Sequence, residues 1–219
     1  MRYWLRILRK NIKLSDFWEK GTSMKKIKIA FTGVFDIDNF GDHLFPIIFE
    51  NSLRKRKIDV ELFLFSPYES TQGFGIAKKV YSIREMEKLH KINKFDAIVV
   101  GGGEIIHFYS FKQKNHEEKY VEYPIFETWI VPSIIGRKYG IPVIWNNPGC
   151  PFEFDGYQNY IAGKVLGNVS FMSVRNQFSY DALINYNANV KVSVDTAFNI
   201  KEVFPKWKLK RQVKGKYVV

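Results

Sequence analysis

The chain has 219 residues, of which 46% are hydrophobic and 16% aromatic, so it holds enough apolar material for a packed globular core. Its formal net charge of +12 resides mainly at the two ends: residues 1–23 hold six basic and two acidic residues, and residues 201–219 hold seven and one. The nearly neutral remainder argues against a nucleic-acid binder, because such a protein carries its basic stripe on the folded surface.

Residues 1–20 combine aromatic and aliphatic side chains with arginines and lysines. One interpretation is an amphipathic helix that makes peripheral contact with an anionic membrane. The alternative is a helix packed on the domain, or an extension outside the fold, since Met24 begins a segment typical of a first strand. We treat residues 1–23 as a basic amphipathic extension.

From residue 24 to residue 200, apolar segments alternate with helical patterns. The alternation predicts an α/β fold with a doubly wound, mostly parallel sheet, whose ligands bind at the carboxyl ends of the strands. The predicted strands are 26–32, 59–65, 96–100, 141–145, 170–174 and 190–194, and the predicted helices are 42–56, 82–92, 121–139, 157–167 and 176–186.

Residues 201–219 begin as a polar, basic linker and end in Lys216-Tyr217-Val218-Val219, which is typical of the opening of a strand. Because a strand needs partners, we expect a second domain that these 219 residues lack.

The single cysteine, Cys150, excludes an intramolecular disulfide and a cysteine-based metal site, and it favours a reducing compartment. No apolar stretch approaches the about 20 residues that cross a bilayer. We therefore expect a cytoplasmic protein, at the inner face of the membrane if residues 1–20 bind there.

The loop after the first predicted strand, residues 33–42, carries three carboxylates and an asparagine. Such a loop at a helix start binds sugar hydroxyls, supplies a general base or caps the helix. For Asp42, capping and function are equally favoured. Asn39 and Gly41 tolerate a left-handed turn, so Asn39-Phe40-Gly41-Asp42 is expected to act as a unit at the strand–helix junction.

Three glycines, Gly101, Gly102 and Gly103, come directly after a buried strand and are followed by Glu104. Backbone amides in such a run approach a phosphate or a sugar ring. A purely structural turn needs fewer glycines, so we favour ligand binding. The run is neither a dinucleotide-binding fingerprint nor a Walker loop.

Polar and aromatic residues follow two of the predicted strands: His107 and Tyr109 come after the glycines, and Asn146 and Asn147 come after the next strand. We expect both sets to face one crevice, where aromatic and amide side chains suit a carbohydrate. His107 is equally well interpreted as an ordinary loop residue. The spacing of the four histidines predicts no metal site, and nothing adjacent to Cys150 would activate it as a nucleophile.

Arg175 ends the predicted strand 170–174, and Ser179 lies in the helix that follows. A guanidinium beside a helix start suits a phosphate or carboxylate, which favours an anion-binding role. The alternative is a structural ion pair with Asp195.

In this order, the motifs resemble the polysaccharide pyruvyl transferase family. The resemblance covers roughly residues 26–200 and rests on Asn39 to Asp42, Asp96 to Gly103, Ser173 to Ser179 and Val194 to Phe198. One departure is Thr196, where the family commonly has proline. The resemblance implies the Rossmann-like half of a GT-B-type fold, with the active site in a cleft between two domains.

Members of that family transfer the pyruvyl unit of phosphoenolpyruvate to two sugar hydroxyls as a ketal and release phosphate. The resemblance therefore implies phosphoenolpyruvate as co-substrate, no other cofactor, and a glycan of the cell surface as acceptor, lipid-linked if residues 1–20 contact a membrane. On that template Arg175 grips the donor. Asn39, Asp42 and Gly101 to Glu104 shape the acceptor side, with Asp42 as candidate base.

The resemblance also implies a catalytic histidine in the carboxyl-terminal half of the family, and none of the four histidines here matches it. We therefore expect the 219 residues alone to be inactive, or to need a second domain or partner chain. Two alternatives stay open: a glycosyltransferase of the same architecture that uses a nucleotide sugar, and a non-catalytic sugar-binding half-enzyme.

Overall fold

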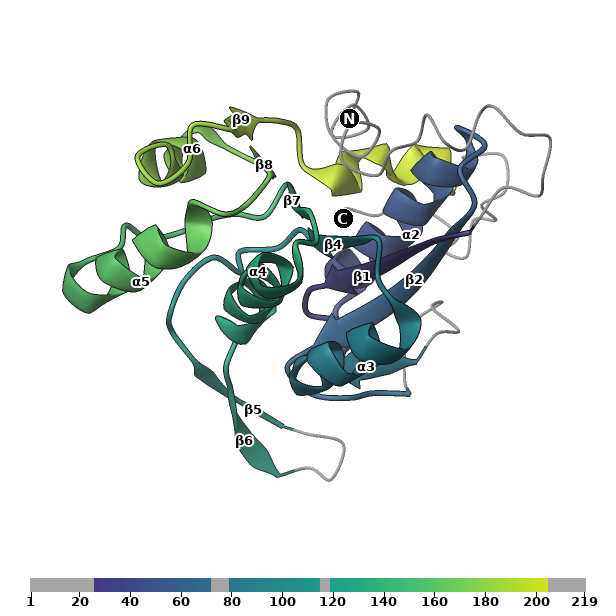
Figure 1. Ribbon diagram of the computed structural model, residues 1–219, viewed down its shortest axis with the longest axis horizontal. Coiled ribbons are helices and arrows are strands. Elements are labelled where there is room, and N and C mark those ends of the chain that lie inside the picture. Colours follow the sequence, from purple (N-terminus) through teal and green to yellow (C-terminus); the bar gives the residue numbers. More distant parts are fainter. Residues whose placement is uncertain (1–25, 72–78, 115–118, 205–219) are drawn as a thin grey trace, which may run out of the picture.

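A computed structural model describes residues 26–71, 79–114 and 119–204 of the chain. Within these residues seven strands form one sheet, in the order β3-β2-β1-β4-β7-β8-β9, and every neighbouring pair is parallel (Figure 1). The strands are β1 (Ile27–Thr32), β2 (Val60–Ser66), β3 (Val80–Ser82), β4 (Ala97–Val100), β7 (Val143–Asn146), β8 (Phe171–Val174) and β9 (Val190–Val192).

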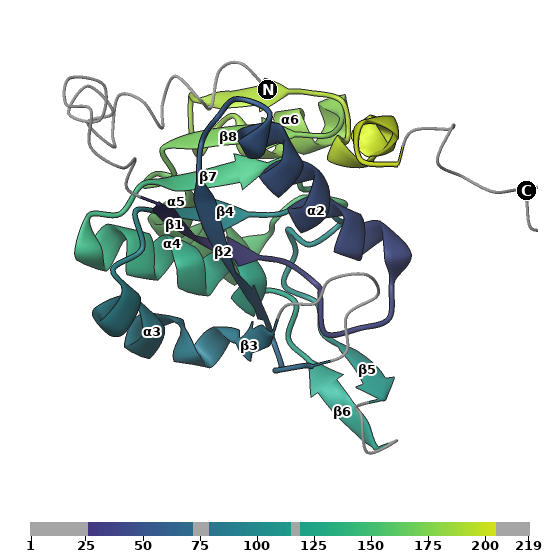
Figure 2. The same cartoon turned by 90° about the vertical axis from the view of Figure 1, so that its right-hand side faces the viewer.

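Helices cover both faces of the sheet, which confirms the predicted doubly wound α/β fold. One face carries α2 (Phe40–Arg54) and the 3-10 helix η3 (Thr196–Glu202). The other carries four α-helices and a short 3-10 turn, and Figure 2 shows α2 and the pair α3 and α4 on opposite sides of the strands. These elements are η2 (Ile83–Glu85), α3 (Met86–Asn93), α4 (Glu127–Tyr139), α5 (Gly156–Leu166) and α6 (Gln177–Leu183).

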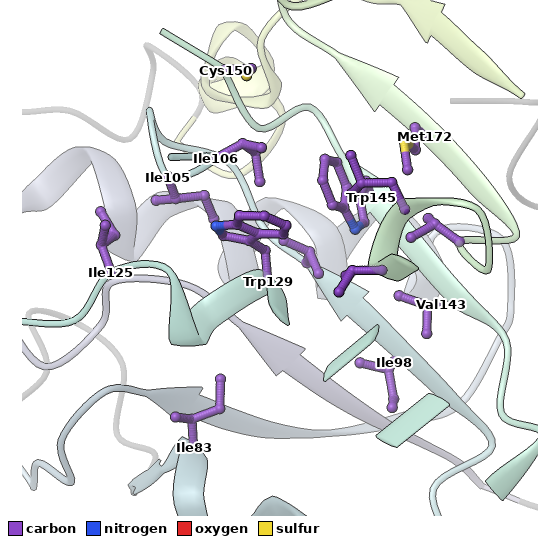
Figure 3. Close-up of a cluster of buried hydrophobic side chains, with 14 of the residues drawn as sticks. Ile83, Ile98, Ile105, Ile106, Ile125, Trp129, Val143, Trp145, Cys150 and Met172 are labelled. Atoms are coloured by element: carbon purple, nitrogen blue, oxygen red, sulfur yellow. The ribbon is translucent and has the colours of Figure 1, made fainter. Parts of the chain in front are cut away.

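The continuous apolar runs in the sequence are the central strands of this sheet. All four residues of β4 are buried, as a strand that is covered on both faces requires. Beneath α4, Trp129 packs edge-on against Trp145 of β7, with ring centroids 6.2 Å apart (Figure 3). Both indoles are fully buried, so they anchor α4 to the middle of the sheet.

The beginning of α2 differs from the prediction. The helix starts at Phe40, and its N-cap is Asn39, whose side chain accepts a hydrogen bond of 3.0 Å from the backbone N–H of Gly41. The prediction that Asp42 caps this helix is therefore wrong. Asp42 lies in the first turn, where a carboxylate faces the positive end of the helix dipole.

The segment between β4 and α4 contains a hairpin that the sequence did not reveal. Strands β5 (Phe111–Lys114) and β6 (Tyr120–Tyr123) pair antiparallel, apart from the main sheet (Figure 1). The predicted helix 121–139 is therefore wrong at its start, because it begins only at Glu127. Pro124 favours extended backbone for the residue before it, and this separates the hairpin from the helix.

Two predicted segments fall on residues that the structure leaves out. The basic extension, residues 1–23, lies outside the described residues, as do residues 205–219 of the predicted linker. Before that point η3 runs through residue 200 to Glu202, whose carboxylate pairs at 3.2 Å with Lys55, the C-cap residue of α2. None of the described helices is long and apolar enough to cross a membrane.

The order of the strands indicates where in this fold a ligand would be expected to bind. Strands β2 and β3 extend the sheet on one side of β1, whereas β4, β7, β8 and β9 extend it on the other. The winding therefore reverses between β1 and β4. In open parallel sheets, ligands bind outside the carboxyl ends of the strands at such a reversal.

Gly136 of α4 packs closely on the sheet, whereas Gly163 of α5 does not, so substitutions at the two positions can be compared. A methyl group at Gly136 would collide with the side chain of Val143 and lie 3.0 Å from the carbonyl oxygen of Ile141, whereas one at Gly163 of α5 would meet nothing within 4 Å. We expect Gly136→Ala to lower the free energy of unfolding by about 1–3 kcal/mol. Gly163→Ala should raise it by up to about 1 kcal/mol, because alanine favours a helix.

Urea unfolding of both variants, followed by circular dichroism, measures the two changes. Equal effects of the two substitutions would contradict the close contact between α4 and β7.

Candidate functional site

An ion-pair cluster occupies the carboxyl edge of the sheet. Arg175 directly follows β8, and its guanidinium donates to Glu104, which lies on the loop after β4, and to Asp195, which follows β9. The contact with Asp195 joins Nη1 to Oδ2 at 3.3 Å. Arg175 thus connects the loops that follow three different strands.

The loop after β7 passes directly beneath this cluster. A Cβ atom at Gly149 would overlap the carboxylate of Glu104 and lie 2.8 Å from Nε of Arg175. A side chain at this position would therefore force the Glu104 carboxylate or the Arg175 guanidinium to move. The position therefore belongs to the site, although it carries no side chain.

Backbone hydrogen bonds join the β4 and β7 loops into a paired ribbon beyond the edge of the sheet. The N–H of Gly149 donates to the carbonyl of Gly103 at 2.8 Å, and the N–H of Ile106 donates to the carbonyl of Gly149 at 3.1 Å. Gly103 also forms a parallel bridge with Pro148. The two loops therefore hold a fixed position relative to each other.

Asp42 lies over the end of the glycine run. Gly103 has φ +96°, which side-chain-bearing residues rarely adopt, and a Cβ atom there would be 3.1 Å from Oδ1 of Asp42. Among the described residues none donates a hydrogen bond to this carboxyl group. Burial raises the pKa of Asp42 to about 7, against the influence of Arg175, while Asp195 and Asp36 raise it further.

Asp36 connects the β1 loop to the hairpin. The hydroxyl of Tyr123 donates to its Oδ1 at 2.5 Å, and the backbone N–H of Tyr68 donates to its Oδ2 at 3.0 Å. Burial raises the pKa of Asp36, and these hydrogen bonds oppose that shift. Asp36 therefore holds β6 against the sheet edge.

Among the predicted site residues, the side chains of Asn39, Asn147 and Ser179 are held by backbone groups. Asn39 caps α2 through Gly41. Nδ2 of the buried Asn147, whose φ is +59°, donates to the carbonyl of Val194 at 2.8 Å and so fixes the start of η3. The hydroxyl of Ser179 accepts from the N–H of Cys150 at 2.8 Å. Asn146 is also buried, and its side-chain nitrogen has no hydrogen-bond partner in the described structure.

The first two glycines of the run are required by packing. A Cβ atom at Gly101 would lie 2.8 Å from the carbonyl oxygen of Thr32, and one at Gly102 would lie 2.6 Å from the ring of Phe45. Close contact with the core thus accounts for both residues without a ligand. The prediction that the run contacts a ligand stays a prediction, and Gly103 is the member that faces a titratable group.

His107 is held between backbone groups of its own loop. Its Nδ1 accepts from the N–H of Tyr109 at 3.2 Å, and its backbone N–H donates to the carbonyl of Ile105 at 3.0 Å. Burial lowers the pKa of His107, so the ring is neutral at pH 7. This arrangement suits a loop-positioning residue. His43 and His90 also hydrogen-bond to backbone groups, and His116 lies outside the described residues.

Neither a thiolate nor a metal cluster contributes to this edge. Cys150 is fully buried, and burial raises the pKa of its thiol to about 12, which disfavours the nucleophilic form. Over the ranges 26–71, 79–114 and 119–204, no group of three or more His, Cys, Asp or Glu side chains is arranged to hold a metal ion.

Two features of the site escaped the sequence analysis: Gly149, and the contact of Asp36 with Tyr123. Gly149 follows a buried strand just as Gly101 does, so the same pattern could have identified it. Tyr123 is 87 residues from Asp36 in the chain, and no local pattern predicts that pairing.

Comparison with known proteins gives one family match. The family model described as polysaccharide pyruvyl transferase matches residues 39–219. Among solved structures, the chain is similar to one titled "Crystal structure of RSP, a Rex-family repressor", with 12% identity, a TM-score of 0.34, and coverage of 93% of this chain and 84% of that one. A search of curated proteins finds no match.

The raised pKa of Asp42 makes stability depend on pH. Its carboxyl group binds a proton more tightly in the folded protein (pKa about 7) than in the unfolded chain (3.8), so stability falls as pH rises through this interval. Between pH 5 and pH 8, wild type should lose about 2–3 kcal/mol more of its unfolding free energy than Asp42→Asn, which cannot titrate.

Urea unfolding at the two pH values measures this difference. Asp38→Asn, at an exposed position in the same loop, serves as the matched control and should behave as wild type. A pH dependence that Asp42→Asn leaves unchanged would show that this carboxyl group is not the one perturbed.

Proposed function

The chain belongs to the polysaccharide pyruvyl transferase family, and we propose that it binds phosphoenolpyruvate at Arg175 for transfer of the pyruvyl group to a sugar as a ketal. The observation that carries this proposal is the position of Arg175. The guanidinium lies at the carboxyl edge of the sheet, within reach of the glycine loop, and has one fixed and one replaceable carboxylate partner.

The two carboxylate partners of Arg175 differ in how firmly their side chains are held in place. Asp195 caps η3 by accepting a hydrogen bond of 2.8 Å from the N–H of Ala197, so its carboxylate is held in place. The side chain of Glu104 is 41% exposed. We infer that the carboxylate or phosphate of the donor replaces Glu104 on the guanidinium, because an exposed ion pair contributes only about 0–1 kcal/mol and is readily exchanged.

The reaction balances without an added reductant or oxidant. A proton is added to the methylene carbon of phosphoenolpyruvate, C2 gains positive character, and the first sugar hydroxyl bonds to C2. The C2–O bond to phosphate then breaks, and the second hydroxyl completes the ketal. The two hydroxyl protons account for the new methyl hydrogen and the proton on the released phosphate.

We assign Asp42 to proton transfer with the acceptor hydroxyl. A carboxyl group with a pKa of about 7 exchanges protons efficiently near neutral pH. It faces Gly103, and its charge is coupled to that of Arg175, so a group bound between them would lie within reach of both.

The same proposal includes the acceptor, the place where it is assembled, and a second domain or chain. The acceptor is a cell-surface glycan assembled on the cytoplasmic side of the membrane, and a second domain or chain completes the cleft. We propose no cofactor beyond phosphoenolpyruvate and no nucleic-acid partner.

Binding of phosphoenolpyruvate to the 219-residue chain tests the role of Arg175. We expect Arg175→Ala to weaken binding by at least about tenfold, because a charge-assisted contact is lost. Arg54→Ala is the matched control: Arg54 is also paired with a glutamate, Glu50, but lies at the far end of α2. Isothermal titration calorimetry gives both dissociation constants.

UDP-glucose is titrated in parallel, because a glycosyltransferase would bind the nucleotide sugar instead. Binding of UDP-glucose without binding of phosphoenolpyruvate would contradict the proposal. So would equal affinity of wild type and Arg175→Ala for phosphoenolpyruvate.

Replacement of Glu104 tests the exchange of partners. If the donor displaces this carboxylate, Glu104→Gln should bind phosphoenolpyruvate about two- to tenfold more tightly than wild type, because no counter-charge competes for the guanidinium. The same titration measures the change. Glu122→Gln, on the exposed hairpin strand β6, is a control that should leave the affinity unaltered. Weaker binding by Glu104→Gln would show that Glu104 supports the donor.

A further inference from the structure

We propose that Tyr109 and Phe152 form the surface on which a sugar ring of the acceptor stacks. Together with His107 they make a cluster that we call the aromatic platform. This inference rests on the proposed function, because it assigns the acceptor side of the same site.

The platform combines exposure with mutual support. The rings of Tyr109 and Phe152 meet edge to face with centroids 5.0 Å apart, and His107 contacts both, at 5.9 Å and 6.0 Å. Tyr109 is nonetheless 54% exposed and Phe152 48% exposed. Adjacent exposed aromatic side chains that hold one another in place are typical of a binding surface.

Backbone contacts fix the platform before any ligand arrives. Trp129 of α4 donates through Nε1 to the carbonyl of His107 at 3.3 Å, and the N–H of Tyr109 donates to the ring of His107. On the other loop, the thiol of Cys150 donates to the carbonyl of Phe152 at 3.2 Å. A preformed surface loses little conformational entropy when it binds a ligand.

The platform lies beside the ion-pair cluster. Arg175 and Glu104 meet over Gly149, and Phe152 is three residues further along the chain. The Cα atoms of Gly149 and Phe152 are therefore at most about 10 Å apart. On the β4 loop, the N–H of Ile106, the residue before His107, donates to the carbonyl of Gly149 at 3.1 Å. A saccharide on the platform can therefore present hydroxyls to a donor held at Arg175.

The chemistry of the surface selects a sugar ring. Aromatic faces carry negative charge density that attracts polarised C–H groups, and a pyranose presents such groups on one face and hydroxyls at its rim. The family match to polysaccharide pyruvyl transferases supplies an acceptor of this class. A nucleobase also stacks on aromatic rings, and the experiment separates the two.

Saturation-transfer-difference NMR tests the proposal on the 219-residue chain. The probes are the methyl glycosides of glucose, galactose, mannose and N-acetylglucosamine, with uridine monophosphate alongside. We expect wild type to bind at least one glycoside, and Tyr109→Ala and Phe152→Ala each to bind it about three- to tenfold more weakly. Tyr109→Phe should bind as wild type does, because it keeps the ring.

Tyr157→Ala is the matched control, since Tyr157 is a 76% exposed aromatic residue at the start of α5. It should leave glycoside binding unchanged. Glycoside binding that none of the platform variants weakens would overturn the proposal, as would a wild-type chain that binds uridine monophosphate and no glycoside, or none of the probes.

Calorimetry with phosphoenolpyruvate on the same variants separates this inference from the proposed function. Loss of the platform should leave the dissociation constant of phosphoenolpyruvate within about twofold of wild type. Glycoside binding at the platform in a protein that does not bind phosphoenolpyruvate would refute the donor assignment alone.

Discussion

The guanidinium of Arg175 needs negatively charged partners, and its ion pairs connect the loops at the carboxyl edge of this sheet. Arg175 is only partly exposed, and a charge removed from water requires partners. Its partners, Glu104 and Asp195, come from loops after β4 and β9, on either side of β8 in the sheet order. The guanidinium reaches Glu104 across the β7 loop, where glycine at position 149 leaves room for both side chains. One ion-pair cluster thus joins the loops that follow β4, β8 and β9.

The charges around Arg175 set the conditions under which the proposed donor would bind. Glu104 and Asp195 together outweigh the single positive charge, and Asp42 adds a further carboxyl group with a pKa near neutrality. An incoming trianion therefore binds well only if a carboxylate withdraws or takes up a proton. Glu104 can withdraw and Asp42 can hold a proton, whereas Asp195 is fixed by its cap on η3.

The sequence was informative where a local pattern has one structural solution. Buried strands such as β4 follow from composition alone, because a strand that is covered on both faces needs a continuous apolar run. The hairpin β5–β6 was missed because its pairing and its contact with Asp36 are tertiary. In the site, the sequence indicated which loops meet at the edge, and the alternative of an ion pair between Arg175 and Asp195 is confirmed. The second partner, Glu104, was not predicted, since that contact depends on side-chain reach across the sheet.

The ribbon formed by the β4 and β7 loops lets the two halves of the proposed site act independently. The backbone of Ile106, the residue before His107, is bonded to Gly149, whereas the ion pair with Arg175 uses only the side chain of Glu104. The Glu104 side chain can therefore turn away from Arg175 while the backbone beside His107 stays bonded to the Gly149 loop. Exchange of anions at the guanidinium then leaves the platform of Tyr109 and Phe152 in place. A preformed surface beside a replaceable counter-ion fits the two-substrate transfer that we propose, because it would hold both reactants close together.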